Sequence, residues 1–433
     1  MLNYLFNKLI QYYKNQVILN NLNKIDSFSE EKINEFQVNK LNKLINYARA
    51  HCGYYREIFD KIGYNDFSKF DKIPLLDKQI IRNNYDKIVS DQLSEIQHYK
   101  MNTGGSTGEP LEFPVSPHFD PIHQEFYFRF IGYTDGDLIV AFDGSSIPQD
   151  LRENNIFWVN VGGNLPYGSI AFSSLYLNEK TIKYYILKLL ELKPNILRGY
   201  PSFLNDLAIY ILENKIELNF SIKGVQLTAE NANSFQINNI KKAFNTKIYF
   251  QYGHSEVSVF AYTRDDDFMY VCSPFYGFTE VLDENGKHVK NGEVGEIVVT
   301  GFFNYALPFI RYKTGDLAIY KHKLNGIVYL EKITGRSQDF IIGNNNVKTA
   351  LTALIFGQHY KAFKNIIKWQ IIQDIPGIVQ IKIVRGLNFS QIDEDEIRLK
   401  FKMICNIEVS FLYVNEIALS KRGKFQFLIQ KIS

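Results

Sequence analysis

Cysteine is scarce in this chain of 433 residues, and the few cysteines are widely separated. They are three in number, Cys52, Cys272 and Cys405, and none belongs to a C-x-x-C pair. Disulfide frameworks and structural zinc sites need close, paired spacings, so the sequence argues against both. Unpaired cysteines suit a reducing compartment, and we therefore expect a cytoplasmic protein.

Basic clusters and long apolar runs are also missing. Lys and Arg total 49 against 46 acidic residues, which gives a formal net charge of +3. Nucleic-acid-binding proteins concentrate Lys and Arg on one face or along one helix, so we expect no nucleic-acid partner. A membrane-spanning helix needs about 20 consecutive apolar residues, and the sequence has no such run. It therefore predicts no transmembrane segment.

The N-terminus is amphipathic but lacks the marks of a secretory signal. Lys8 and Lys14 interrupt any apolar core, and no small-residue cleavage site comes after them. The apolar stripe predicts a helix that packs on its own domain, while contact with a membrane surface or with a second subunit of a homodimer stays open. The stripe consists of Leu2, Leu5, Phe6, Leu9 and Tyr13.

Length and residue pattern predict an α/β protein with more than one domain. A chain of 433 residues exceeds a single hydrophobic core. Residues 1–98 have helical apolar spacing, and from Asp137 short apolar runs alternate with helical stretches, which indicates a parallel-rich sheet. Residues 277–329 alternate strands and turns, as a β-rich subdomain does. We expect a large N-terminal domain over 1–338 and a small, mobile α+β domain over 339–433.

The segment 102–110 combines three glycines with three hydroxyl residues before Pro110. Glycines let consecutive backbone N–H groups turn toward one point, and hydroxyls add donors, so the segment is a candidate anion nest for a polyphosphate. It is not a Walker loop, because no Lys succeeds Gly108. A plain flexible turn has a similar composition, so the meaning of the segment depends on the motifs downstream of it.

Further motifs lie downstream of this loop in a fixed order. Taken singly, each has a plain structural reading: Tyr252 and His254 as core aromatics, Glu230 as a helix cap, Asp316 as a turn former. The order and spacing of the set are far more specific than any member. The motifs are Leu227-Thr228-Ala229-Glu230, Tyr252-Gly253-His254-Ser255-Glu256, the run from Pro308 to Asp316, Gly335-Arg336-Ser337-Gln338-Asp339, and Lys421-Arg422-Gly423-Lys424.

As a set, the motifs resemble the adenylate-forming superfamily of acyl-CoA synthetases, non-ribosomal adenylation domains and luciferases. The chain is most similar to the phenylacetate–CoA ligase and CapK-type (capsular polysaccharide) branch, and the likeness covers nearly all of it. The resemblance implies that a carboxylate attacks the α-phosphate of ATP, forming an acyl adenylate and pyrophosphate. The segments that carry the closer likeness are 44–57, 72–78, Gly199-Tyr200-Pro201-Ser202 and 310–316.

The resemblance also implies an ATP site. The loop residues Thr103, Gly104, Gly105, Ser106, Thr107 and Gly108 would hold the β- and γ-phosphates. Ser255 would donate to the α-phosphate, and Glu256 would hold Mg²⁺, a hard cation that prefers oxygen ligands. Tyr252 would stack on adenine, with Ala229 and Glu230 along the edge of the base.

The same resemblance assigns the remaining roles. Asp316 would accept hydrogen bonds from the ribose hydroxyls, and Arg336 would add a contact to ribose or phosphate. Lys424, a mobile point charge on the small domain, would bridge the carboxylate and the α-phosphate. Rotation about Asp339 as hinge would then withdraw Lys424 and admit a nucleophile.

The substrate side is less defined. Tyr200 and His254 would line the carboxylate pocket, and His254 is also a candidate base toward an amine. Two acceptors remain open, coenzyme A and an amine such as an amino sugar or amino acid. The short stretch from the Tyr252 motif to Gly277 favours the amine and surface-polysaccharide biosynthesis.

Three departures from the family pattern are visible. Leu111 stands where many relatives have Lys after the loop proline, and the C-terminal motif lacks the usual Pro-Arg-Thr lead. Some phenylacetate ligase relatives carry a Cys/His zinc cluster, of which only Cys272 is present here, so we predict no zinc. A catalytically degenerate nucleotide-binding scaffold stays open as an alternative, although the retained site residues argue against it.

Overall fold

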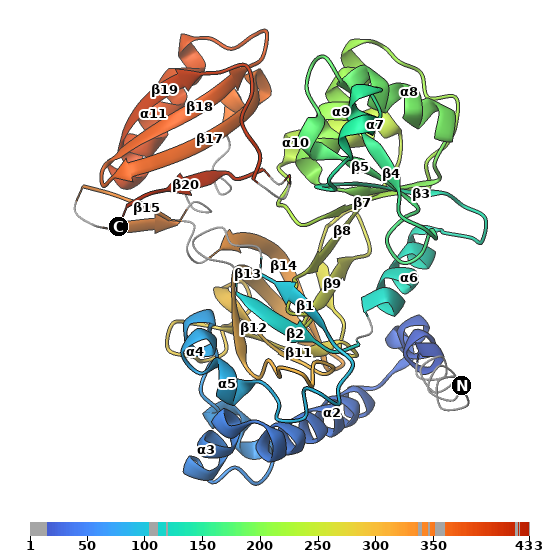
Figure 1. Ribbon diagram of the computed structural model, residues 1–433. Helices are drawn as coiled ribbons and strands as arrows, with labels where there is room; N and C mark the ends of the chain where they lie inside the picture. Colours follow the sequence, from blue (N-terminus) through green and yellow to red (C-terminus); the bar gives the residue numbers. More distant parts are fainter. Residues whose placement is uncertain are drawn as a thin grey trace. The chain divides into compact units, whose positions relative to one another are not determined.

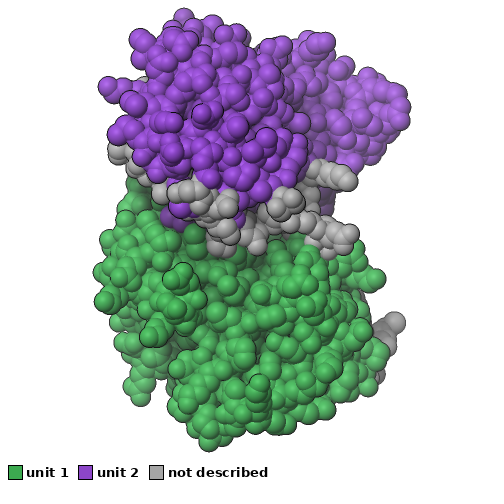
Figure 2. Space-filling view, turned by 90° about the vertical axis from the view of Figure 1, so that its left-hand side faces the viewer, with its two compact units in different colours: residues 1–139, 163–168, 249–333 green, residues 140–162, 169–248, 334–433 purple. Residues whose placement is uncertain are grey.

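The structure is a computed structural model, and it describes residues 15–103, 111–117, 120–336, 340–344, 347–350, 360–420, 423 and 425–432. The predicted N-terminal stripe, most of the glycine-rich loop, Asp339 and Lys424 lie outside the described residues. Internal contacts divide the chain into two compact units, which Figure 2 colours separately. Unit 1 comprises 1–139, 163–168 and 249–333, and unit 2 comprises 140–162, 169–248 and 334–433.

Unit 1 begins with helices, as predicted for residues 1–98. In α2, Ser29 caps the N-terminus by accepting from the N–H of Lys32, and the buried side chains include Ile33, Leu41 and Leu44 at helical spacing. That apolar face explains why the segment is helical and which side of it is buried. The elements are η1 (Ile25–Ser27), α2 (Glu30–His51), α3 (Gly53–Lys61), η2 (Phe67–Lys72), α4 (Lys78–Asn83) and α5 (Tyr85–Ile88).

The sheet of unit 1 is antiparallel, in the order β11-β12-β13-β14-β10-β9-β8. The pairs β11–β12, β12–β13, β10–β14, β9–β10 and β8–β9 all run antiparallel. This confirms the β-rich part predicted for 277–329. The strands are β8 (Ile248–Gly253), β9 (Phe260–Thr263), β10 (Tyr270–Cys272), β11 (Gly277–Leu282), β12 (Val294–Gly301), β13 (Tyr312–Leu324) and β14 (Ile327–Arg336).

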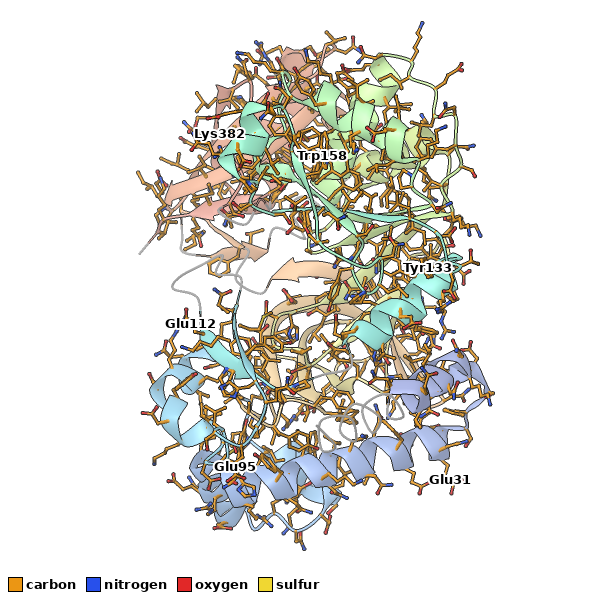
Figure 3. All side chains as sticks on the ribbon, turned by 45° about the vertical axis from the view of Figure 1, so that its right-hand side comes forward. Glu31, Glu95, Glu112, Tyr133, Trp158 and Lys382 are labelled. Atoms are coloured by element: carbon orange, nitrogen blue, oxygen red, sulfur yellow. The ribbon has the colours of Figure 1, made fainter. Side chains whose placement is uncertain are left out.

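A helix and a hairpin complete unit 1. Helix α6 (Asp120–Ile131) is held to the sheet by Tyr127, whose hydroxyl lies 2.8 Å from the carbonyl oxygens of Phe250 and Thr263. Strands β1 (Tyr99–Asn102) and β2 (Glu112–Val115) pair antiparallel, with Asn102 opposite Glu112. The predicted phosphate loop is therefore the connection of a β-hairpin, and Glu112 begins the return strand (Figure 3).

Unit 2 contains the parallel strands that the alternating pattern predicted. Its part of the sheet has the order β7-β6-β3-β5-β4, and the pairs β6–β7 and β3–β5 are parallel. Helix α9 packs on β3 through Phe203 and Phe142, whose ring centroids are 5.2 Å apart. The strands are β3 (Ile139–Asp143), β4 (Trp158–Asn160), β5 (Ile170–Ser173), β6 (Ile196–Gly199) and β7 (Gly224–Thr228). The helices are α7 (Gln149–Glu153), η3 (Ser174–Tyr176), α8 (Ile182–Leu192), α9 (Pro201–Glu213) and α10 (Ser234–Phe244).

The C-terminal part of unit 2 has a small sheet with the order β19-β18-β17-β20 and one long helix, α11 (Figure 1). Ile397 and Phe401 of α11 are fully buried in its core, and the helix and strands together agree with the α+β character predicted there. The predicted boundary at 338/339 stays a prediction. The elements are β15 (Phe340–Ile342), β16 (Lys348–Ala350), η5 (Lys361–Asn365), β17 (Ile366–Ile375), β18 (Ile378–Arg385), α11 (Gln391–Cys405), β19 (Glu408–Tyr413) and β20 (Leu428–Gln430).

Across the part of the chain that the structure describes, no helix is long and apolar enough to cross a membrane.

Candidate active site

The turn after strand β8 carries the motif that ends in Glu256. Tyr252 and Gly253 end the strand, and the chain turns tightly so that the N–H of Val257 donates to the carbonyl of His254 at 3.1 Å. Val257 has φ 51°, a left-handed value that a β-branched residue rarely adopts. The backbone is therefore held in a strained turn beside the predicted site.

Two glycines make room for this turn. A Cβ on Gly277 would lie 2.2 Å from the carbonyl oxygen of Ser258, and one on Gly301 would lie 2.6 Å from its Oγ. Ser258 in turn donates its hydroxyl to the carbonyl of Glu256 at 2.9 Å. Close backbone packing against β11 and β12 thus fixes the position of Glu256.

Glu256 is a buried carboxylate with polar neighbours on both oxygens. It is 5% exposed, and the fully buried Tyr312 donates its hydroxyl to Oε1 at 2.7 Å. Nδ1 of His254 lies 3.1 Å from Oε2.

These neighbours decide the charge of Glu256. Burial alone raises the pKa of a carboxyl group, but His254, Tyr312 and Lys78 together lower the pKa of Glu256 to about 2. Attraction to positive charge and donated hydrogen bonds both favour the ionised form. Glu256 is therefore a carboxylate at neutral pH in spite of its burial.

Tyr252 and Asp316 form a second contact in the same region. The hydroxyl of Tyr252 donates to Oδ2 of Asp316 at 2.8 Å, and burial raises the pKa of Tyr252 well above its ordinary value. The tyrosine is thus a neutral donor to a carboxylate. The ring of His254 lies between the two contacts in the sense that it is near both tyrosines. Its centroid is 6.5 Å from that of Tyr252 and 6.2 Å from that of Tyr312.

A buried ion pair supports the strand that carries Tyr312 and Asp316. Arg311 donates from Nε and Nη2 to the two oxygens of Glu280, at 3.1 and 2.9 Å. Its Nη1 also donates to the carbonyl of Ile73 at 2.8 Å. Main-chain hydrogen bonds join Leu76 to the same strand, so Arg311 ties the segment that leads to Lys78 to the start of β13.

Thr103 closes the base of the predicted phosphate loop. Its side chain is buried, and its hydroxyl accepts from the N–H of Leu111 at 3.1 Å while its own N–H donates to the carbonyl of Leu111 at 3.0 Å. Thr103 therefore clamps the two ends of the loop, and the phosphate contact predicted for it stays a prediction. The residues Gly104 to Gly108 lie outside the described residues.

Tyr200, Ala229 and Glu230 belong to unit 2. Gly199 passes so close to Phe142 that a Cβ would lie 2.6 Å from the phenylalanine carbonyl oxygen, and the N–H of Tyr200 donates to that oxygen at 3.1 Å. Burial, with Asp143 and Glu230 nearby, raises the pKa of Tyr200 to about 12. Tyr200 thus stays a neutral phenol at the N-terminus of α9.

The structure brings some of the predicted residues together. Tyr252, His254, Glu256 and Asp316 form one cluster in unit 1, with Ser255 in the same turn. Arg336 ends β14, and its side chain lies outside the described residues, as do Asp339 and Lys424.

Three residues that were not predicted as site residues support this cluster. Tyr312 and Lys78 lower the pKa of Glu256, and Arg311 anchors the start of β13. All three stood in segments that the sequence marked as family-like.

Comparison with known proteins shows what the chain is similar to. Residues 345–431 match the family model described as CapK C-terminal domain. The chain is also 27% identical over 425 residues to Protein CapK of Staphylococcus aureus, covering 92% of this chain and 89% of the relative. The chain is therefore similar to CapK over nearly its whole length. It is 20% identical over 377 residues to phenylacetate–coenzyme A ligase of Thermus thermophilus, with 77% of each chain covered.

The chain shares its fold with a solved CoA ligase structure. A solved structure of 2-hydroxyisobutyryl-CoA ligase in the postadenylation state with 2-HIB-AMP superposes with a TM-score of 0.70 at 19% identity. The match covers 93% of this chain and 89% of that ligase. The α/β class with a β-rich part and a smaller C-terminal sheet domain is confirmed.

Proposed function

We propose that the chain is an ATP-dependent ligase that activates a carboxylic acid as an acyl adenylate and passes the acyl group to an amine in surface-polysaccharide biosynthesis. The observation that carries the proposal is the cluster of unit 1, in which an ionised, buried Glu256 lies beside the Tyr252–Asp316 contact. Homology to CapK and to a CoA ligase supports the same reaction class.

The first step joins two anions, so the site must hold them in line and offset their charge. A carboxylate oxygen attacks the α-phosphorus of ATP, a P–O bond forms, and pyrophosphate leaves. Asp316 would bind the ribose, and the ring of Tyr252 would face the base. The hydrogen bond between these two side chains fixes the base-binding and ribose-binding groups as one unit.

Glu256 fits a role in Mg²⁺ binding. It is ionised, and a carboxylate has about four lone-pair positions, so Tyr312 and His254 leave room for a cation. Mg²⁺ is typically held by one or two carboxylates together with substrate phosphates. No cluster of three or more His, Cys, Asp or Glu residues able to hold a metal occurs within the described ranges. The ATP phosphates would therefore supply the other ligands.

In the second step the acceptor attacks the acyl carbonyl, a C–N bond forms, and AMP leaves. Coenzyme A is the competing acceptor, supported by the homology to phenylacetate–coenzyme A ligase. Lys424 would serve the first step only, and withdrawal about Asp339 would admit the acceptor. A cytoplasmic location belongs to the same proposal, supported by three free cysteines.

Carboxylate-dependent exchange of pyrophosphate into ATP tests the proposal. We expect exchange with at least one member of a panel of aryl, fatty and amino acids. Glu256→Gln should lose most of it and change its Mg²⁺ dependence, whereas the exposed control Glu331→Gln should not. ATP binding by calorimetry without exchange for any acid would overturn the proposal in favour of the scaffold. Mass spectrometry of the products with coenzyme A or amino sugars then identifies the acceptor.

A further inference from the structure

Within unit 2, two hydrogen bonds hold the residues on either side of Lys424. The hydroxyl of Ser174 donates to the carbonyl of Gly423 at 2.8 Å. The N–H of Phe425 donates to Oε1 of Glu230, also at 2.8 Å. Ser174 and Glu230, called the seat below, thus bind the backbone both before and after the lysine.

The first half of this seat accepts only glycine. Gly423 has φ +69°, a conformation that L side chains rarely adopt. A Cβ there would lie 2.2 Å from Oγ of Ser174 and 2.8 Å from Cα of Gly144. Any larger residue would push the turn off Ser174.

Glu230 joins the second half of the seat to helix α9. Its Oε2 accepts from the N–H of Ser202 at 3.1 Å, in the first turn of α9. A helix N-terminus favours negative charge, so the helix fixes the carboxylate that holds Phe425. Ala229, with φ 68°, turns the chain to place it there. Glu230 thus caps α9 and binds the C-terminal turn at the same time.

A second contact reinforces the arrangement further along α9. Lys368 of β17 forms an ion pair with Asp206, and both side chains are about four-fifths buried. The pKa of Asp206 is raised by its burial, against the attraction of Lys368. Helix α9 therefore contacts the C-terminal part of the unit at two separate places.

We propose that Glu230 and Ser174 are positioning residues for the backbone next to Lys424 in the chain, and that their contacts are made for the adenylation step alone. This inference rests on the proposed function, in which Lys424 serves the first half-reaction. Loss of the seat would then slow adenylation and leave acyl transfer from preformed acyl adenylate unchanged. A general structural role would lower both steps together.

The test compares the two half-reactions in three variants. Ser174→Ala removes one neutral hydrogen bond, and we expect adenylation to fall about threefold to tenfold. Gly423→Ala should lower the rate of adenylation by more than about tenfold. Glu230→Gln replaces one acceptor oxygen by an NH2 group that faces one of the two N–H donors, and adenylation should fall about ten- to a hundredfold. For Ser174→Ala and Gly423→Ala, the KM for ATP and the rate of acyl transfer should stay unchanged.

Two matched controls separate the seat from backbone and hydroxyl effects. Gly162→Ala introduces a side chain at φ +116° with nothing within 4 Å of its Cβ. Ser410→Ala removes a hydroxyl that donates to Val379 on the C-terminal sheet. Both should leave the two half-reactions unchanged.

A readout besides activity keeps the two proposals distinguishable. Trypsin cleaves after Lys and Arg, and Lys421, Arg422 and Lys424 are neighbours of Gly423 in the sequence. We expect Gly423→Ala and Ser174→Ala to speed cleavage here by several-fold over wild type and both controls. If the two variants are cleaved faster but the wild-type protein shows no pyrophosphate exchange, the proposed function is overturned and the seat is supported. Unchanged cleavage, or equal losses in both half-reactions, would overturn the seat.

Discussion

The two carboxylates that matter most in this protein are held in opposite ways. Glu256 in unit 1 is surrounded by side chains, and its charge depends on Tyr312, His254 and Lys78. Glu230 in unit 2 is held by backbone N–H groups, one of them 195 residues further along the chain. Side-chain partners tune the charge of a group, whereas backbone donors fix where a segment lies. The first arrangement suits chemistry and the second suits placement.

The largest effect should come from the buried ion pair that supports the cluster of unit 1. Glu280→Ala leaves the guanidinium of Arg311 buried without its carboxylate, and we expect a loss of about 3–5 kcal/mol in the free energy of unfolding. Urea titration measures it. The exposed pair of Lys321 and Glu331 is the control, since Lys321→Ala should cost less than about 1 kcal/mol. Equal losses in the two variants would contradict the role of Arg311.

The next effect concerns the charge of Glu256. Its folded pKa lies below its unfolded value, so it stabilises the protein above the unfolded pKa and loses that contribution as the pH falls toward about 2. Tyr312→Phe removes a donor and should raise this pKa. Stability at neutral pH should fall by about 1.5–3 kcal/mol.

The pH dependence provides the check on Tyr312→Phe. In unfolding experiments across the acid range, the variant should approach wild type as the pH falls. A constant difference at every pH would mean that the lost hydroxyl affects packing and not the charge of Glu256.

The smallest effect compares two left-handed residues, one in each unit. Ala229 is exposed with φ 68°, and Val257 is buried with φ 51°. Ala229→Gly relieves a strain of about 1–2 kcal/mol but gives the unfolded chain more freedom, so stability should change by less than about 1 kcal/mol. Val257→Gly also loses buried apolar surface and should destabilise by more. Thermal unfolding compares the two, and equal effects would remove the distinction.

Much of the fold could be predicted because local pattern determines it. The apolar spacing within residues 1–98 and the short apolar runs from Asp137 onward produced helices and strands as expected. The cluster of Tyr252, Glu256 and Asp316 was predicted by resemblance of its motifs, and its members lie on β8, the turn after it and β13.

The supporting contacts could not be predicted, because they depend on residues far apart in the chain. Nothing near Arg311 indicates that its partner is Glu280, which precedes it by a whole strand and a turn. The clamp that Thr103 forms, with its hydroxyl accepting from the N–H of Leu111, depends on the register of its hairpin. The bond from Phe425 to Glu230 spans 195 residues and has no local signal.

The residue ranges that form the two units have a consequence for synthesis on the ribosome. Unit 1 ends at residue 333, whereas unit 2 draws on residues up to 433. Chains fold as they are made, N-terminal parts first, so the Glu256 cluster can form while the last hundred or so residues are still untranslated. Glu230 receives Phe425 only when translation is nearly finished. A nascent or truncated chain would therefore hold the Glu256 cluster before the contact from Phe425 to Glu230 could form.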